Sequence, residues 1–444
     1  MNLPVALYIF LFAIAIFAPL RWSIVAYLVL SAVDFDSGNS GIGILNAAKG
    51  LVYPLYLLWR LRSQAGHKTT VLAPVAWLFF VAYVAIASIW SQFPLSAVKL
   101  VGEMIGSLLI CLAFLRAAKG GYLTPSILLP VTIGVLTLGV LRGIFLPGYG
   151  DERDRFNGFT TAQGYASLLV SLYALALCSK SLRPVVRVPV CAGLFLAVVF
   201  NGSRIWLLGL LAATLIGLFI SEAKSWLKIC TVGLGILVAA GVVWASDPIM
   251  TLIAKSARSS RIAAILTAVY EGDEKSTGLG TYRFRRGLYQ HAIEAIESSS
   301  ATQLMVGHGT SNGRFLRGDL NKGIGDPNRA VHDEWLRIFY EWGIVGSLLW
   351  LVFVGSIIVY AYQGVRRDKR GYARPLLAYL PAFLAGLSTE NILAGAGYAA
   401  NIGLLFLIAL ASVSHRQMAK QAPRWRRLEP REREQMDLIG RRGP

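Results

Sequence analysis

The fold is decided by apolar stretches such as VPVCAGLFLAVVFNGSRIWLLGLLAATLIGLFI, residues 188–220. This stretch holds two apolar runs, 188–201 and 203–221, which meet at Asn201-Gly-Ser203, and its single charged residue is Arg204. A helix that crosses a bilayer needs about 20 apolar residues, and fewer where neighbouring helices shield it. Both runs are therefore predicted to be membrane-spanning helices joined by a short turn.

The composition extends this interpretation to the whole chain. Of 444 residues, 55% are hydrophobic and 15% are charged, whereas a soluble domain carries roughly 25% charged residues. This balance, with a mean hydropathy of +0.56, excludes a cytosolic enzyme, a secreted disulfide scaffold, a disordered chain and a nucleic-acid-binding domain as the main body. The net charge is +19, and in a membrane protein such an excess of Lys and Arg is typical of cytoplasmic loops beside anionic lipid.

We expect an all-α polytopic membrane protein with about 12 transmembrane helices, because several of the candidate segments are short. The candidates are 3–20, 21–33, 44–59, 70–90, 98–117, 123–147, 161–179, 188–201, 203–221, 226–246, 334–362, 375–389 and 391–414. The first has no basic region before it and another apolar segment follows directly, which favours an anchor over a cleaved signal. The four cysteines lie in or beside apolar segments without a CxxC pair, so we expect no disulfide framework and no zinc site.

Basic residues in the short connections predict the orientation. Four basic connections lie an even number of crossings apart, at 60–68, 116–119, 180–187 and 366–370. They are expected in the cytoplasm together with the basic tail 415–444. The opposite, exoplasmic face, which is periplasmic in a Gram-negative cell, receives 91–97, 148–160, 201–203 and 247–333. Twelve crossings would place the N-terminus inside and thirteen outside, so its side stays open.

The long connection 247–333 carries charges of both signs and cannot lie in the membrane. Its segment 249–269 has the pattern of helices lying on the membrane surface. In 286–298, helical spacing places Leu288, Ala292, Ile293 and Ile296 on one face. A loop of this length is usually functional.

The chain is therefore predicted to have four parts. About ten transmembrane helices occupy 1–246, one large exoplasmic loop with short helices occupies 247–333, the final helices occupy 334–414, and a basic cytoplasmic tail occupies 415–444. We expect the loop to carry the catalytic residues.

Charged residues at the predicted exoplasmic membrane edge are candidate site residues, because an ionisable group there is a functional hypothesis by default. They are Arg155, Arg204, Arg283, Arg285, Arg286 and the run His332-Asp333-Glu334. The structural alternatives are arginines that snorkel to lipid headgroups and a histidine that only flanks a helix cap. Arg204 fits that alternative poorly, since positive charge on the exoplasmic face opposes the usual bias.

Several exoplasmic guanidinium groups without an acidic cluster facing them fit a ligand with two or more phosphates. In a membrane protein such a ligand is a polyprenyl diphosphate, and a nearby histidine could take the proton of an acceptor hydroxyl. The histidines of the loop lack an HExxH-like spacing, so we expect neither a metal nor another cofactor. The run Gly307-His-Gly-Thr-Ser-Asn-Gly313 could hold phosphate through backbone N–H groups, although a plain turn is favoured.

At these residues the sequence resembles the O-antigen ligase and O-antigen polymerase superfamily of bacterial membrane glycosyltransferases. Gly202-Ser203-Arg204 at a helix start is similar to the family's Ser-Arg motif, and Arg155-Phe-Asn-Gly158 to a weaker Arg-x-x-Gly pattern. His332-Asp-Glu-Trp-Leu336, followed by Glu341-Trp-Gly343 and Gly346, is similar to the family's His-Asn-x-x-Leu and Glu-x-Gly-x-x-Gly ending.

A further match runs through the exoplasmic loop. Arg285, Tyr289 and Ala292, then Gly307-His-Gly309, are similar to the family's Arg, Trp, Ala and Gly-x-Gly run. The chain departs from the family pattern at Asp333, where Asn is usual, at Tyr289, where Trp is usual, and in lacking the usual Pro-Asn after the Arg-x-x-Gly pattern.

The resemblance implies a GT-C-like helical fold in the bacterial inner membrane, with its active site on the periplasmic face. It implies metal-independent transfer of a glycan from undecaprenyl diphosphate to an acceptor hydroxyl, on lipid A core or on a growing surface polysaccharide. The implied catalytic residues are Arg204 and Arg285, which would bind diphosphate, and His332, as a base or as a charge stabiliser. Arg155, Arg283, Arg286 and Asp333 are expected to help bind the substrate.

Two functions of other classes remain open from the sequence. A transporter or flippase for the same lipid-linked glycan would place charges near the bilayer midplane and show repeated halves, whereas the charges here gather at one face. A non-catalytic assembly subunit could recruit partners through the basic tail, although a solvated tail that touches lipid is the favoured interpretation. No nucleic acid is expected as a partner.

Overall fold

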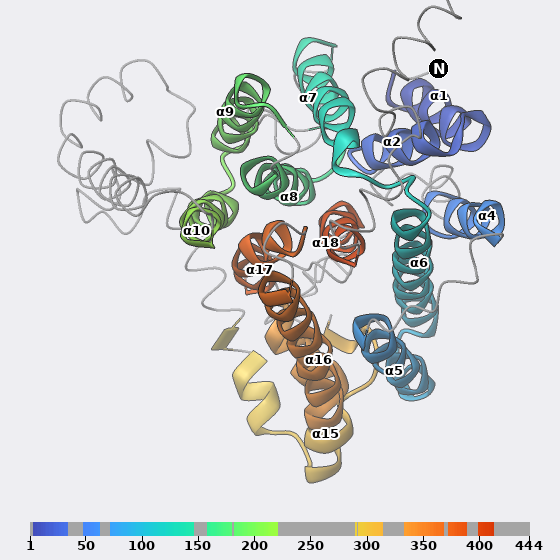
Figure 1. Cartoon of the computed structure of the whole chain (residues 1–444). Helices are drawn as coiled ribbons and strands as arrows, with labels where there is room; N and C mark the ends of the chain where they lie inside the picture. Colours follow the sequence, from blue (N-terminus) through green and yellow to red (C-terminus); the bar gives the residue numbers. More distant parts are fainter. Residues whose placement is uncertain are drawn as a thin grey trace, which may run out of the picture.

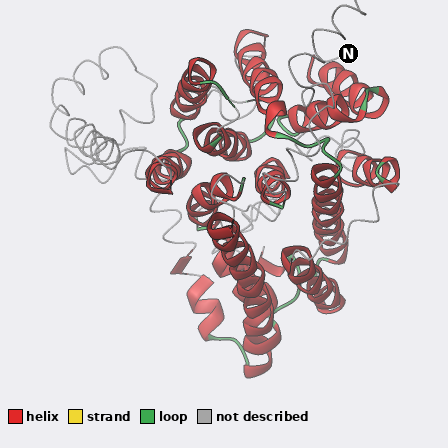
Figure 2. Cartoon of the chain, viewed as in Figure 1, coloured by secondary structure: helices red, strands yellow, loops and turns green. Residues whose placement is uncertain are grey.

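A computed structural model describes residues 3–33, 48–62, 72–145, 158–179, 182–220, 289–290, 292–313, 333–367, 372–388 and 398–412. Within these ranges the regular structure is helical, apart from one isolated bridge between Val33 and Phe159 (Figure 2). The predicted all-α class is therefore confirmed over the described residues.

The helices follow the apolar segments of the sequence. They are α1 (Leu3–Phe17), α2 (Leu20–Leu30), α4 (Tyr53–Arg60), α5 (Leu72–Ala87), α6 (Pro94–Lys119), α7 (Leu128–Phe145), α8 (Ala162–Cys178), α9 (Pro184–Asn201), α10 (Arg204–Ile220), α15 (Ala301–Val306), α16 (Glu334–Arg367), α17 (Ala373–Leu387) and α18 (Tyr398–Ala411). Each predicted span overlaps one of these helices, except 226–246, which lies outside the described residues.

Five of the described helical stretches are long and apolar enough to cross a membrane. They are Ala73–Trp90, Pro94–Lys119, Pro125–Phe145, Pro184–Asn201 and Glu334–Arg367. Large apolar side chains on several helices face outward, among them Phe17 and Phe219, which are 85% and 76% exposed. A soluble monomer rarely exposes so much apolar surface, so these faces fit contact with lipid and the chain is a membrane protein.

Helix α8 occupies the middle of one half of the bundle, where α7, α9, α10, α17 and α18 pack around it (Figure 1). Small and hydroxyl residues allow this crowding, since close approach of helices in a membrane requires small side chains. Ser167 Oγ lies 2.5 Å from the hydroxyl of Tyr379 in α17. Tyr173 and Thr214 form a similar hydroxyl pair with α10, at 2.9 Å.

The other half of the bundle is built on α16, which packs along α5 and against α15 (Figure 1). α16 is not one continuous helix, because Gly343 has a φ of +61° and a ψ of −161°. These angles lie in a region that is essentially restricted to glycine. The predicted span 334–362 is therefore interrupted, and its first nine residues form a separate short helix before the break.

Candidate functional site

The turn that precedes Arg204 is built from the residues of the Ser-Arg motif. Gly202 ends α9 in the left-handed conformation, with a φ of +70°. The backbone carbonyl of Ser203 accepts the first hydrogen bond of α10, from the N–H of Leu207 at 2.9 Å. Arg204 is thus the first residue of α10, as the sequence predicted. A helix N-terminus presents unpaired N–H groups and favours anions.

Contacts between helix ends hold the predicted exoplasmic turn 201–203, the start of α8 and the end of α2 in place. The side-chain amide of Asn201 donates to the carbonyl of Ala162, at 3.1 Å, which ties the end of α9 to the start of α8. The N–H of Phe159 donates to the carbonyl of Ala32, at 2.9 Å, beyond the end of α2. Gly158 is required here, because a Cβ atom would lie 2.6 Å from that carbonyl oxygen.

The loop Gly307–Gly313 lies against the break in α16. The N–H groups of His308 and Gly309 donate to the carbonyls of Tyr340 and Glu341, each at 2.9 Å. Gly307 and Gly309 have φ values of +82° and +102°, and a Cβ atom on Gly309 would approach the Trp90 carbonyl oxygen to 2.9 Å. The Gly-x-Gly motif is therefore a docking element for a broken helix.

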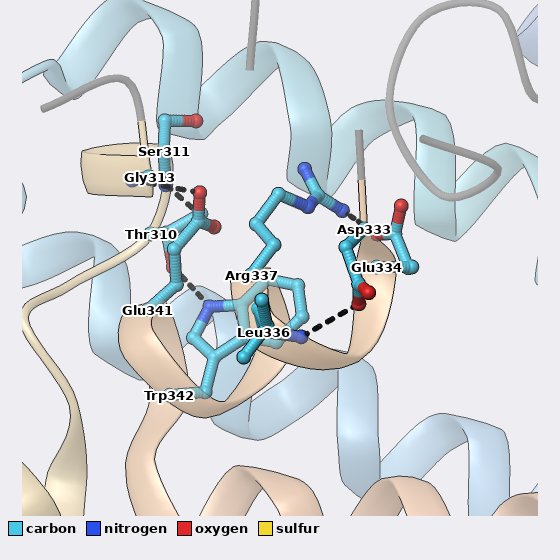
Figure 3. A network of polar contacts seen from close by, with 9 residues as sticks. All are labelled: Thr310, Ser311, Gly313, Asp333, Glu334, Leu336, Arg337, Glu341 and Trp342. Atoms are coloured by element: carbon cyan, nitrogen blue, oxygen red, sulfur yellow. Dashed lines mark hydrogen bonds and ion pairs between the residues drawn. The ribbon is translucent and has the colours of Figure 1, made fainter. Parts of the chain in front are cut away.

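Glu341 fastens the rest of this loop (Figure 3). Its carboxylate accepts hydrogen bonds from the N–H groups of Ser311, at 2.9 Å, and Gly313, at 3.0 Å. The remaining N–H groups of the loop donate to protein carbonyls as well: Gly307 to Gln303, Thr310 to Ala87 and Asn312 to Gly309. Since every backbone donor from Gly307 to Gly313 is in use, this loop does not offer a phosphate cradle, and the favoured interpretation as a turn agrees with the structure.

Thr310 joins the loop to α5. Its hydroxyl donates to the carbonyl of Val84, at 2.7 Å, and accepts from the indole N–H of Trp342, at 3.1 Å. The hydroxyl of Tyr83 donates to the carbonyl of Val306, at 2.9 Å, and also approaches the carbonyl of Trp342, at 3.3 Å. The contact with Trp342 gives this carbonyl a hydrogen-bond donor next to Gly343, where the break interrupts the regular hydrogen bonding of the helix.

Asp333 caps the start of α16. Its carboxylate accepts from the N–H of Leu336, at 3.0 Å, and its carbonyl accepts from the N–H of Arg337. Burial raises the pKa of the Asp333 carboxyl above its ordinary value, although hydrogen bonds from the Leu336 and Trp335 backbone oppose the shift. Aspartate is among the preferred N-cap residues, so this position has a structural role beside the predicted role in substrate binding.

Arg337 and Glu334 form a buried ion pair one turn into the same helix (Figure 3). Their side chains are 2% and 0% exposed. The guanidinium also lies over the ring of Trp342, 5.6 Å from its centroid. Charged residues are almost never fully buried unless they are paired, so this pair marks a site that the sequence analysis did not single out.

The helical segment before α15 packs on α16. Ala292 is fully buried against Tyr340, with Tyr289, Ile296 and Leu336 around them. The predicted apolar face of 286–298 is partly wrong, because Ile293 points outward and is 47% exposed. Tyr289, where the family usually has Trp, lies on the side that packs against Ala292 and Tyr340, which is the side predicted for Ile293.

His308 contacts both α16 and the helical segment before α15, through Tyr340 and Ser299. Its ring stacks on Tyr340, with centroids 4.1 Å apart, and its Nε2 lies 2.7 Å from Ser299 Oγ. Burial lowers the pKa of His308, so the neutral ring is favoured near neutral pH.

Most of the predicted catalytic and substrate-binding residues lie outside the described residues. These are Arg155, Arg283, Arg285, Arg286 and His332. The same holds for the predicted surface helices of 249–269 and for the basic tail 415–444. Among the predicted site residues, the structure describes Asp333 with its contacts and Arg204 by its place in the backbone.

Besides Arg337, the sequence analysis missed other buried cations, among them Lys49 and Arg142. Lys49, 1% exposed, donates from Nζ to the carbonyl of Val33, at 2.8 Å. Arg142, 5% exposed, lies in the last turn of α7, beside Tyr165. Each stands in or at the edge of a predicted span, which is the signal that would have found them.

The fold and these sites define the class of the protein: a helical membrane protein in which a glycine-rich loop is held by hydrogen bonds against a broken helix. Residues 189–351 match the sequence profile of a family described as O-antigen ligase. The predicted resemblance to the O-antigen ligase and polymerase superfamily is thereby confirmed over this segment. A search of curated proteins found no match to the chain.

Proposed function

We propose that the protein is a membrane glycosyltransferase that moves a glycan from undecaprenyl diphosphate to an acceptor hydroxyl. The acceptor is lipid A core for a ligase, or a growing surface polysaccharide for a polymerase. The family match over residues 189–351 carries this proposal. The reaction takes place at the exoplasmic face of a bacterial inner membrane, within a GT-C-like bundle of about 12 helices whose basic tail is cytoplasmic.

In the proposed reaction, the acceptor oxygen attacks the anomeric carbon of the donor glycan. Its proton passes to His332, the bond between the anomeric carbon and the diphosphate oxygen breaks, and undecaprenyl diphosphate leaves with the electron pair. Arg204 and Arg285 offset the charge of the diphosphate, because a guanidinium binds phosphate oxygens in pairs without a metal. Arg155, Arg283, Arg286 and Asp333 support substrate binding.

The position of Arg204 supports this assignment. It is the first residue of α10, and the positive end of a helix adds to the attraction for a phosphate group. The turn before it is held by Gly202 and by the contact between Asn201 and Ala162. The start of α10 is thus fixed in place, as a diphosphate-binding residue requires.

The test is transfer by the purified enzyme from a lipid-linked glycan donor to an acceptor, with and without excess EDTA. We expect turnover to be unchanged by EDTA and to be lost in His332→Ala, while donor binding is retained. Loss of activity that a divalent cation restores would overturn the metal-independent mechanism. Transport of the donor across vesicles without transfer would overturn the assignment as an enzyme.

The pH profile separates the two roles open to His332. A base must be neutral, so turnover rises with pH through the pKa of the histidine. A cationic stabiliser of the leaving diphosphate gives the opposite slope. A rising profile supports the base, and a falling one replaces it by the charge stabiliser.

A further inference from the structure

The buried guanidinium of Arg337 stands in an unusual place for a positive charge. It lies in the first turns of α16, where the helix dipole disfavours cations. Burial adds to the cost, because a buried charge is stable only when it is well paired. The pairing comes from Glu334, and the carboxylates of Glu341 and Glu103 also act on the guanidinium.

This surrounding set of carboxylates argues against a role in binding the diphosphate. The guanidinium is paired with Glu334 and also feels the negative charges of Glu341 and Glu103, so it is already compensated and its neighbours would repel an anionic ligand. The Nε–H of Arg337 has no hydrogen-bond acceptor among the described residues. The contact with Glu334 is therefore its main polar attachment in the described part of the chain.

Arg337 also touches both chain segments that meet at this end of α16. A Cβ atom on Gly313 would lie 3.1 Å from Cγ of Arg337, so the aliphatic part of the side chain packs directly under the glycine-rich loop. On its other side, the backbone N–H of Arg337 donates to the carbonyl of Asp333, at 3.1 Å. Asp333 in turn directly follows His332 in the sequence.

We propose that Arg337 is a positioning residue for the glycosyl transfer: paired with Glu334 and packed under Gly313, it holds the first turn of α16 and its cap residue Asp333, the direct neighbour of His332 in the sequence. This inference rests on the proposed function, in which His332 acts on the acceptor proton or on the leaving group. It assigns Arg337 no contact with the substrate.

The experiment is a cycle of variants in the full-length protein, with transfer and donor binding measured separately. Misplacement of a catalytic group by about 1 Å costs about 10²-fold in rate, so Arg337→Gln should lower kcat by that order while the Kd for the lipid-linked donor is unchanged. In a His332→Ala background, Arg337→Gln should lower kcat no further, to within about twofold. A fall of equal size in both backgrounds, or weaker donor binding, would show a general structural role and overturn the inference.

Arg366→Gln is the matched control. Arg366 lies at the other end of α16 and is exposed, and its guanidinium is stacked 5.0 Å above the ring of Tyr362, much as Arg337 is stacked on Trp342. It should transfer glycan at the wild-type rate. If Arg337→Gln fails to accumulate, the paired variant Glu334→Gln/Arg337→Gln removes both buried charges together and is measured instead. Low kcat with normal accumulation of this paired variant supports the inference, and wild-type kcat overturns it.

The outcomes separate this inference from the proposed function. Wild-type turnover in His332→Ala would remove that histidine from the reaction whatever Arg337 does. A large loss in His332→Ala, with none in Arg337→Gln, would leave the proposed function intact and overturn the positioning role alone.

Discussion

Gly343 and Gly307 face each other so closely that a Cβ atom on Gly343 would lie 2.6 Å from the backbone nitrogen of Gly307. Both residues have positive φ values. The break in α16 and the turn of the glycine-rich loop therefore depend on each other. A side chain on Gly343 would press on the backbone of Gly307, and a side chain on Gly307 would press on the backbone of Glu341 and Trp342.

Gly343→Ala should strongly destabilise the fold. The conformation costs about 1–3 kcal/mol for a residue other than glycine, and the added methyl group would also press on the carbonyl oxygen of Met305. We expect a lower thermal denaturation temperature in detergent. Gly355→Ala is the control, because it lies in the same helix with nothing within 4 Å of its Cβ position. Equal stability of the two variants would contradict the role given to the break.

Substitutions at Asp333 should separate capping from charge. Asp333→Asn retains an N-cap side chain, whereas Asp333→Ala should cost about 0.5–2 kcal/mol of stability. The pKa of Asp333 is raised by burial, so the folded chain holds this proton more tightly than the unfolded chain and stability falls as pH rises from the unfolded towards the folded pKa. Asn carries no such cost. We expect Asp333→Asn to keep turnover within about tenfold, a barrier change of about 1.4 kcal/mol. A larger loss of transfer in this variant, at normal stability, would assign the carboxylate itself to the chemistry.

The stability of the protein should fall in mildly acidic buffer through His308. Its pKa is lowered by burial, so below the unfolded value of about 6.5 the unfolded chain binds more protons than the folded one and stability decreases as pH falls. Above that value the effect vanishes. Denaturation temperatures measured between pH 5 and pH 8 should show a weaker pH dependence in His308→Gln. Identical profiles for variant and wild type would exclude this contribution.

Arg204→Lys should lose most transfer activity at normal expression. Lysine keeps the charge but lacks the planar fork that grips two oxygens. Arg183→Lys, at the opposite end of α9, should remain active. Near-native turnover of Arg204→Lys would reduce Arg204 to an anchor at the membrane interface.

Arg285→Ala should lose most transfer activity, as Arg204→Lys does, and Arg286→Ala should lose less. The reverse order would move the assignment of the diphosphate-binding arginine from Arg285 to Arg286.

Reporter fusions test the predicted sidedness. A reporter placed after residue 300 should be active only outside the cytoplasm, and one at residue 440 only inside. Cytoplasmic activity at residue 300 would invalidate the topology and, with it, the proposed mechanism.

The helical segments could be predicted from the sequence because the length and apolar character of a span are local properties. The runs 188–201 and 203–221 overlap the helices α9 and α10, as predicted, and Arg204 begins α10 as expected. The resemblance to the O-antigen ligase family could be predicted as well, because the motifs follow one another along the chain and the profile match covers most of them.

Tertiary structure alone decided how the motifs work together. The carboxylate of Glu341 reaches N–H groups 28 and 30 residues earlier in the chain, and Thr310 bonds to a carbonyl 226 residues away. Such contacts leave no local pattern, because each depends on two distant segments meeting in space. The burial of Arg337 and of Lys49 was hidden for the same reason: a charged residue is recognised as buried only when the helices that enclose it are in place.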